Sequence, residues 1–78
     1  MNRNYILRKA IRDVLNSNMG RFMSAAEIRD YMHGLPTPQD FTEHQIAASI
    51  LQFSHSVHND YEIKYDEERK VNMYRIEI

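Results

Sequence analysis

Two segments of this 78-residue chain begin with the same paired signal for the start of a helix. Ser24 and Glu27 have the spacing of a capping box, in which each side chain accepts a hydrogen bond from the other residue's backbone N–H. Thr42 and Gln45 repeat that spacing later in the chain. Each box is framed by an apolar pair at the spacing of a hydrophobic staple, Met23 with Ile28 and Phe41 with Ile46. The repetition predicts two helices that begin at these boxes, with an apolar stripe that includes Tyr31 in the first and a buried stripe that includes Leu51 and Val57 in the second.

A further helix is predicted nearer the N-terminus. Its apolar residues recur at helical spacing and form one face: Ile6, Leu7, Ala10, Ile11, Val14 and Leu15. Arg8, Lys9 and Arg12 fall together on the opposite face. The run from Asn16 to Gly20 offers asparagine or glycine for a left-handed cap, so we expect the helix to end there.

The apolar pattern changes to a period of two after Asn59 and Asp60. Tyrosine and isoleucine alternate with charged residues over 61–65. Over 73–78 the apolar side is Tyr74, Ile76 and Ile78, and the other side is Met73, Arg75 and Glu77. Period two on both sides of the charged run 66–70 is typical of an antiparallel hairpin with one buried face. Pro36 and Pro38 exclude a long helix over residues 35–40, because proline removes a backbone donor and restricts the residue before it.

The predicted order is helix, short strand, helix, helix, strand, strand, with the short strand at 21–23. This order resembles the winged-helix superfamily, in which the C-terminal hairpin is the wing. The resemblance covers nearly the whole chain and predicts an α+β fold with one domain over residues 1–78. The stretch from Gly34 to Phe41 is longer than the tight turn of simple helix-turn-helix proteins.

Composition narrows the classes of function. The chain has no cysteine, so disulfides and thiolate metal sites are excluded, and a reducing compartment such as the cytoplasm is expected. Its N-terminal apolar run is interrupted by charge at once, which predicts neither a signal peptide nor a membrane span. With only Gly20 and Gly34 there is no glycine-rich phosphate loop, and no catalytic set of side chains is evident, so we expect a non-enzyme without a cofactor.

Metal binding is not expected either. His55 and His58 are three residues apart, and His44 lies on a similar side of the same predicted helix. A zinc site would need carboxylates to complete it, and no spacing here matches a zinc module. The expectation is exposed histidines.

The resemblance implies that the helix after Thr42 is a recognition helix that enters the major groove of DNA. Its predicted outward face carries small or amide side chains, which suit base edges and close approach. The residues of this face are His44, Gln45, Ala48, Ser49 and Gln52, with Gln45, Ser49 and Gln52 expected to read bases. The alternative for these residues is an ordinary solvated helix face.

Phosphate contacts would come from elsewhere, because residues 30–63 contain no lysine or arginine. Arg69, Lys70 and Lys64 in the wing are expected to hold the DNA backbone, together with Arg8, Lys9 and Arg12 of the first helix. Asp66, Glu67 and Glu68 lie in the same wing and would repel phosphates. The alternatives are a solvated turn and a solvated helix face with weak ion pairs.

Charge separates two hypotheses of function. Residues 1–29 carry six cations against two acids, whereas residues 30–78 carry four against nine. The first hypothesis follows the usual activity of the superfamily: a small DNA-binding transcriptional regulator that acts on double-stranded DNA as a dimer or within a larger complex. The acidic C-terminal part and the cation-free helix favour the other hypothesis, a protein-interaction module. In that case a protein partner or a second copy would dock on the edge of the final strand, residues 73–78.

Overall fold

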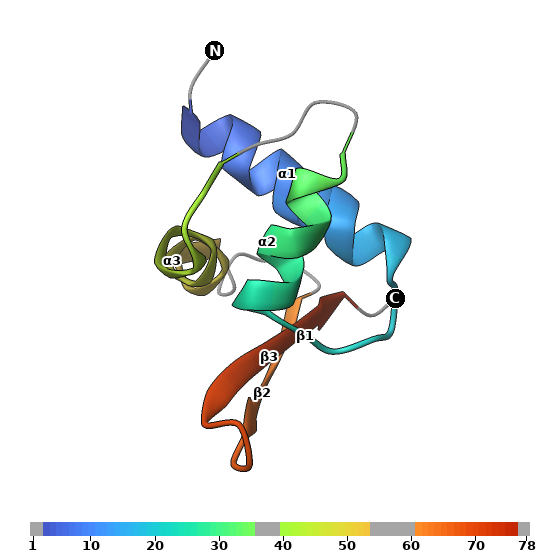
Figure 1. The fold of residues 1–78 in the computed structure, drawn as a ribbon, viewed down its shortest axis with the longest axis vertical. Coiled ribbons are helices and arrows are strands. Elements are labelled where there is room, and N and C mark those ends of the chain that lie inside the picture. Colours follow the sequence, from blue (N-terminus) through green and yellow to red (C-terminus); the bar gives the residue numbers. More distant parts are fainter. Residues whose placement is uncertain (1–2, 36–39, 54–60, 77–78) are drawn as a thin grey trace.

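The computed structural model describes residues 3–35, 40–53 and 61–76, and its elements follow the predicted order (Figure 1). They are helix α1 (Arg3–Ser17), strand β1 (Met23–Ser24), helix α2 (Ala25–His33), helix α3 (Glu43–Phe53), strand β2 (Tyr61–Asp66) and strand β3 (Val71–Ile76). The order confirms the predicted α+β class. Three helices with a three-stranded antiparallel sheet are compatible with a winged-helix topology.

Both predicted capping boxes form. The Ser24 hydroxyl accepts from the backbone N–H of Glu27 at 3.2 Å, and Glu27 accepts from the Ser24 N–H at 3.3 Å. Thr42 accepts from the Gln45 N–H at 3.1 Å, and the Gln45 side chain accepts from the Thr42 N–H at 2.9 Å. The four residues of the two staples are all buried. These contacts satisfy backbone donors that a helix start leaves free, which explains why α2 and α3 begin where they do.

The ends of α1 and α2 differ in backbone conformation. After α1, the Asn18 side chain donates to the Val14 carbonyl at 2.9 Å, and Gly20 has a φ of +83°. This is the left-handed region, which glycine enters without steric cost. Gly34 ends α2 with its N–H directed at the Tyr31 carbonyl, 3.0 Å away, but its φ of −91° is one that any residue adopts. Gly20 is therefore required by conformation, whereas Gly34 is not.

The sheet order is β1-β3-β2, so β3 is the central strand. Met73 and Tyr74 pair with β1 on one side while the whole strand pairs with β2 on the other. The Ile76 carbonyl also accepts from the Gly20 N–H at 3.2 Å. The prediction that the final strand offers a free docking edge is wrong over Met73–Ile76, because the chain before α2 returns to pair with it. Residues 77 and 78 lie outside the described residues.

The core lies where the three helices meet the inner face of the hairpin, and the hairpin itself projects away from the helices (Figure 1). The predicted apolar stripe of α1 is buried from Leu7 to Leu15, with Ile6 partly buried. Met73 was predicted on the polar side of its strand but is buried, since Phe22 covers the outer face of the hairpin beside it. In the described part of the chain, none of the helices has the length and apolar character needed to cross a membrane.

Three residues predicted as buried are exposed instead. Tyr31, Leu51 and Tyr65 keep between 45% and 54% of their surface accessible. Tyr31 and Leu51 lie at the margins of their helical stripes, and Tyr65 is on the part of the hairpin that extends past the helices. The predictions for His55, Val57 and His58 fall outside the described residues.

Candidate functional site

The side of α3 that faces away from the core is more apolar than predicted. His44, Ala48 and Leu51 share that side because they follow one another at intervals of four and three residues. All three are exposed, and Leu51 is 48% accessible although it was expected in the core. The outward side therefore presents the methyl group of Ala48 between the imidazole of His44 and the aliphatic side chain of Leu51.

Two grooves flank α3, and they divide the predicted recognition face between them. The first, here called the α3–hairpin groove, has a volume of about 470 Å³. Its lining includes Ala25 and Ala26 at the start of α2, Glu43 and Ala47 of α3, and Arg69 and Val71 of the hairpin. His44 also lines this groove, and it is the one residue of the predicted face that does so.

The second groove lies between α1 and α3, has a volume of about 220 Å³ and is called here the α1–α3 groove. It is lined by Arg3, Asn4 and Leu7 of α1 and by the other four residues of the predicted face, Gln45, Ala48, Ser49 and Gln52. The predicted face is thus not one continuous surface aimed at a single ligand. His44 faces the hairpin, while the other four residues face toward α1.

Two of the expected base-reading residues have structural roles. Ser49 is only 8% exposed, so its placement on the outward face is wrong: α3 turns this position toward α1. Gln45 is exposed, but its carboxamide oxygen accepts the Thr42 N–H of the capping box. Gln52 is exposed as predicted. The Gln45 side chain that predicts the start of the helix in the sequence is therefore engaged in the capping box in the fold.

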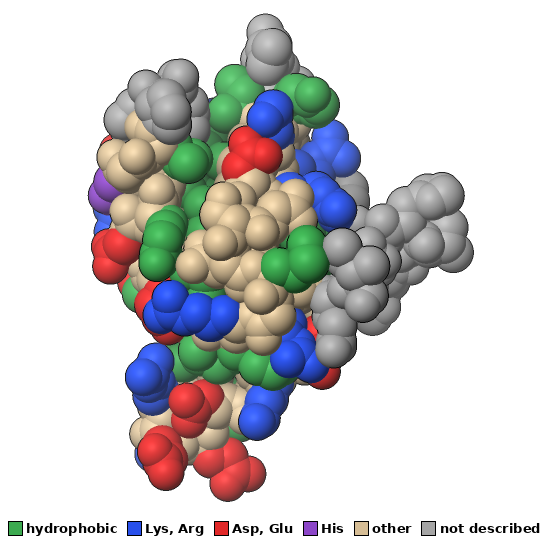
Figure 2. All heavy atoms as spheres, turned by 90° about the vertical axis from the view of Figure 1, so that its right-hand side faces the viewer, with side chains coloured by type: hydrophobic (Ala, Val, Ile, Leu, Met, Phe, Trp, Pro, Cys, Tyr) green, Lys and Arg blue, Asp and Glu red, His purple; other side chains and the backbone are tan. Residues whose placement is uncertain are grey.

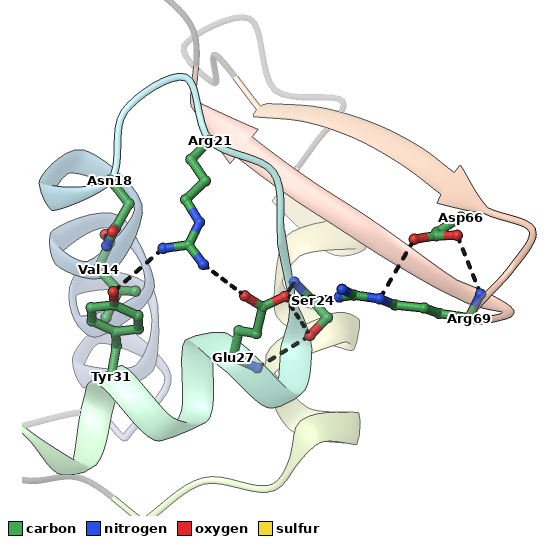
Figure 3. Close-up of polar contacts among 8 residues, drawn as sticks. All are labelled: Val14, Asn18, Arg21, Ser24, Glu27, Tyr31, Asp66 and Arg69. Carbon is green, nitrogen blue, oxygen red and sulfur yellow. Dashed lines mark hydrogen bonds and ion pairs between the residues drawn. The ribbon is translucent and has the colours of Figure 1, made fainter.

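Glu27 of α2 makes polar contacts with Ser24 and Arg69, which line the α3–hairpin groove, and with Arg21 (Figure 3). Its carboxylate accepts from the backbone N–H of Ser24, at 3.3 Å, at the N-terminus of α2. It also pairs with Arg21 at 3.1 Å and with Arg69 at 3.5 Å. A residue predicted only as a helix cap thus also joins the segment before β1 to the hairpin loop. Sequence reasoning missed this role because Arg21 and Arg69 carry no local signal that relates them to Glu27.

The loop between β2 and β3 is held by its first residue. Asp66 accepts from the N–H groups of Glu68 and Arg69 at 3.0 and 3.2 Å, and its other carboxylate oxygen lies 3.9 Å from the Arg69 guanidinium. Arg69 is therefore shared between two acids, Glu27 and Asp66. Lys70 is exposed and has a φ of +57°, in the left-handed region that lysine enters at a steric cost.

The remaining hairpin cations lie on the other face of the sheet, around Phe22. The Lys64 ammonium is 5.7 Å and the Arg75 guanidinium 4.4 Å from the centre of the Phe22 ring. Arg75 also pairs with Glu62 at 2.7 Å and donates to the Gly20 carbonyl at 3.2 Å. These contacts fasten the hairpin to the segment before β1, and neither cation lines the α3–hairpin groove.

The three cations predicted on the first helix are not brought to α3. Lys9 pairs with Asp13 at 2.9 Å, and this hydrogen bond raises the pKa of Lys9. Arg8 donates to the Asn4 carbonyl at 3.4 Å. The Arg12 guanidinium lies 5.8 Å from the ring centre of Tyr61. None of the three lines either groove beside α3.

Burial raises the pKa of Tyr61, which lies beside this α1 cluster, and the positive charges of Arg12 and Arg8 partly oppose that rise. Burial also raises the pKa of Tyr74 in the centre of the sheet. Both hydroxyls therefore favour the neutral phenol in the folded state.

Charge is unevenly placed over the molecule. On the face drawn in Figure 2, acidic side chains gather at the end of the projecting hairpin, and lysine and arginine are spread over the body with uncharged side chains between them. Glu67 and Glu68 of the loop are both exposed. Glu43 lines the α3–hairpin groove, while Glu27 and Asp66 pair with Arg69 of its lining and Glu27 pairs also with Arg21. These three carboxylates outnumber the two guanidinium groups, so the surroundings of the groove carry more negative than positive charge.

Within residues 3–35, 40–53 and 61–76, no three histidine or acidic side chains are placed to hold a metal ion. No protein-family model, curated protein sequence or solved structure was found to match this chain.

Proposed function

We propose that this chain is a winged-helix domain that binds a protein partner through α3 and the adjacent hairpin. The order of its elements supports the winged-helix assignment, since a β-hairpin follows the two capped helices. The outward side of α3 supports a protein partner, because Leu51 and Ala48 offer apolar area and the described helix contains no lysine or arginine. Aliphatic and aromatic contacts, rather than charge, dominate the centre of protein interfaces.

The pairing of Arg69 with Glu27 is the observation on which this proposal rests most heavily. In winged helices the wing and helix N-termini often contact the DNA backbone. Here the carboxylate of Glu27 lies at both places, on the N–H of Ser24 and beside Arg69. A phosphate approaching this position would meet an existing negative charge. Because phosphate neutralisation supplies most non-specific DNA affinity, this arrangement favours protein over DNA.

Double-stranded DNA is the second candidate, and one observation favours it. The α3–hairpin groove unites the start of α2, the start of α3 with His44, and Arg69 of the hairpin loop. These are the elements through which a winged-helix regulator would contact DNA, as a dimer or within a larger complex. The surface pair of Arg69 and Glu27 contributes only about 0–1 kcal/mol, so a phosphate has a modest barrier to overcome.

A photoreactive amino acid placed in turn at Leu51 and at Met19 distinguishes the candidates. Both positions are about equally exposed, at 48% and 46%, but Leu51 lies on the outward side of α3, whereas Met19 follows α1. After irradiation in a native lysate, we expect a protease-sensitive adduct at position 51 that is absent at position 19. A nuclease-sensitive adduct would support DNA binding instead. Equal labelling at both positions, or no adduct at position 51, would contradict the proposal.

A further inference from the structure

The hairpin leaves part of its central strand open beside the α3–hairpin groove. Strand β1 pairs only with Met73 and Tyr74, because the chain turns into α2 directly after Ser24. Among the described residues, no strand pairs with Val71 and Asn72 on the β1 side. Both residues are exposed and both line the groove. An extended segment laid there would continue the line of β1 and add backbone hydrogen bonds to β3.

The groove beside this edge is walled by small side chains. Ala25 and Ala26 stand on one side and Ala47 on another, with the aliphatic side chain of Val71 39% exposed on the hairpin. Alanine at these positions leaves room for one larger apolar side chain from outside. Alternate residues of an extended segment point to the same side, so every second residue could reach the groove.

The charges around the groove determine whether the remaining residues of such a segment should be basic or acidic. Glu43 lines the groove, and in the described part of the chain no hydrogen bond or ion pair is made by its side chain. Glu27 and Asp66 share Arg69, and Glu27 also pairs with Arg21, so these two carboxylates are matched by two guanidinium groups. The negative charge in excess comes from Glu43 and from Glu67 and Glu68 of the loop, where Lys70 is the neighbouring cation. This field attracts a basic segment and repels an acidic one.

We propose that the α3–hairpin groove binds an extended, basic segment of a partner protein, which pairs with the open edge of β3 at Val71 and Asn72. One apolar side chain of the segment fills the space between the alanines, and its lysine or arginine side chains face Glu43 and the acids of the hairpin. This inference rests on the proposed protein-binding function and adds the class of partner and the mode of binding.

Three ten-residue synthetic peptides test the inference on the full chain by amide chemical shifts. One alternates lysine with valine, one alternates glutamate with valine, and one alternates lysine with serine. We expect the lysine–valine peptide to shift the amides of Ala26, Ala47 and Val71 and to slow hydrogen exchange at Val71 or Asn72. Only one of these two N–H groups points toward the β1 side, because the direction alternates along a strand.

Glu43→Gln and Asp30→Asn are matched variants, since each removes one exposed negative charge and only Glu43 lines the groove. We expect Glu43→Gln to weaken binding of the lysine–valine peptide by roughly two- to fivefold at low salt, with a smaller effect of Asp30→Asn. Equal binding of the glutamate–valine peptide, equal effects of the two variants, or shifts confined to the α1–α3 groove would overturn the inference.

The outcomes separate this inference from the function that it extends. A protein adduct at position 51, combined with no binding of the lysine–valine peptide, would reject the basic extended segment and leave the protein-binding function standing. Binding of the lysine–serine peptide as tightly as the lysine–valine peptide would show that charge alone suffices, and would reject the apolar anchor.

Discussion

Arg69 of the hairpin loop and Glu27 in the first turn of α2 lie 3.5 Å apart, although 42 residues separate them in the sequence. The pair joins the projecting hairpin to the helix that the Ser24 capping box starts. It also sets the charge at the end of the α3–hairpin groove. The contact is exposed on the arginine side, where the side chain keeps 63% of its surface, so the free energy that it contributes is small.

Glu27→Gln should give the chain a measurable affinity for DNA. The substitution removes the negative charge at the N-terminus of α2 and releases Arg21 and Arg69 from their ion pairs, while an amide oxygen can still accept the Ser24 N–H. We expect roughly a fivefold to tenfold gain in affinity for a duplex at low salt, measured by fluorescence anisotropy, with a loss of that gain as salt rises.

Glu68→Gln is the control for that experiment, because it changes net charge equally and no arginine side chain is seen to pair with Glu68 among the described residues. If both variants gained DNA affinity to the same extent, net charge alone would explain the effect. The pairing of Arg69 with Glu27 would then have no special part in ligand choice.

The direct coupling between Glu27 and Arg69 should be weak. A double-mutant cycle with Glu27→Ala and Arg69→Ala, followed by chemical unfolding, should return a coupling free energy below about 1 kcal/mol. Glu27→Ala alone should cost about 1 kcal/mol or more, since it also removes half of the capping box. A coupling energy of several kcal/mol would show that the hairpin is locked to α2 far more firmly than its exposure suggests.

The two glycines should respond differently to alanine. Gly20→Ala should lower the free energy of unfolding by about 1 kcal/mol, because a φ of +83° is strained for a residue with a Cβ. Gly34→Ala should change it by less than about 0.5 kcal/mol, as its φ is ordinary and the added Cβ would lie 3.5 Å from the Tyr31 carbonyl oxygen. Urea unfolding of both variants measures the difference, and a larger cost at Gly34 would contradict the backbone described for the two helix ends.

Lys70 offers a route to a more stable hairpin. Lys70→Gly should raise the free energy of unfolding by about 0.5 kcal/mol, since glycine adopts a φ of +57° without strain. The greater conformational entropy that glycine gives to the unfolded chain offsets only part of this gain. Lys70→Ala removes the same charge and keeps the strain, so it should give no gain. Equal stabilisation by both substitutions would assign the effect to charge.

Stability should fall in alkaline solution because of the buried tyrosines. Their folded-state pKa values are raised above the ordinary value near 10, so their contribution is complete below that pH and is lost as pH rises through the folded pKa. Arg12→Ala should raise the pKa of Tyr61 further, because Arg12 favours the phenolate. The ultraviolet absorbance of the tyrosine phenolate follows the titration. The effect of Arg12→Ala should vanish in a Tyr61→Phe background, and its persistence there would assign it to another tyrosine.

Local signals in the sequence sufficed for most of the fold. The capping boxes at Ser24 and Thr42 and the period of two around the loop placed two helix starts and the hairpin, because such signals act over four or five residues. The central position of β3 had no local signal, since it depends on Met23 and Ser24 returning to pair with Tyr74 and Met73. Non-local pairing of this kind is not written in either strand alone.

The candidate site was less accessible to the same reasoning. Helical angles alone placed His44, Ser49 and Gln52 on one face. In the fold, Ser49 is buried beside α1, and His44 lines the groove between α3 and the hairpin. Arg69 was predicted to contact phosphates because of its place in the hairpin loop. In the fold it pairs with Glu27, which belongs to α2. Side-chain types could be predicted from the sequence, whereas their neighbours depended on how the elements pack.

The most direct test of the account is a titration of the native chain with duplex DNA at low salt, followed by amide shifts across α2, α3 and the hairpin. Because Glu27 holds Arg69 and the start of α2, we predict no saturable shifts at Ala26, His44 or Arg69 up to about 100 μM DNA, near the weak end of non-specific binding. Saturable shifts at these residues, diminishing as salt is added, would contradict the account and establish DNA as the ligand of this surface.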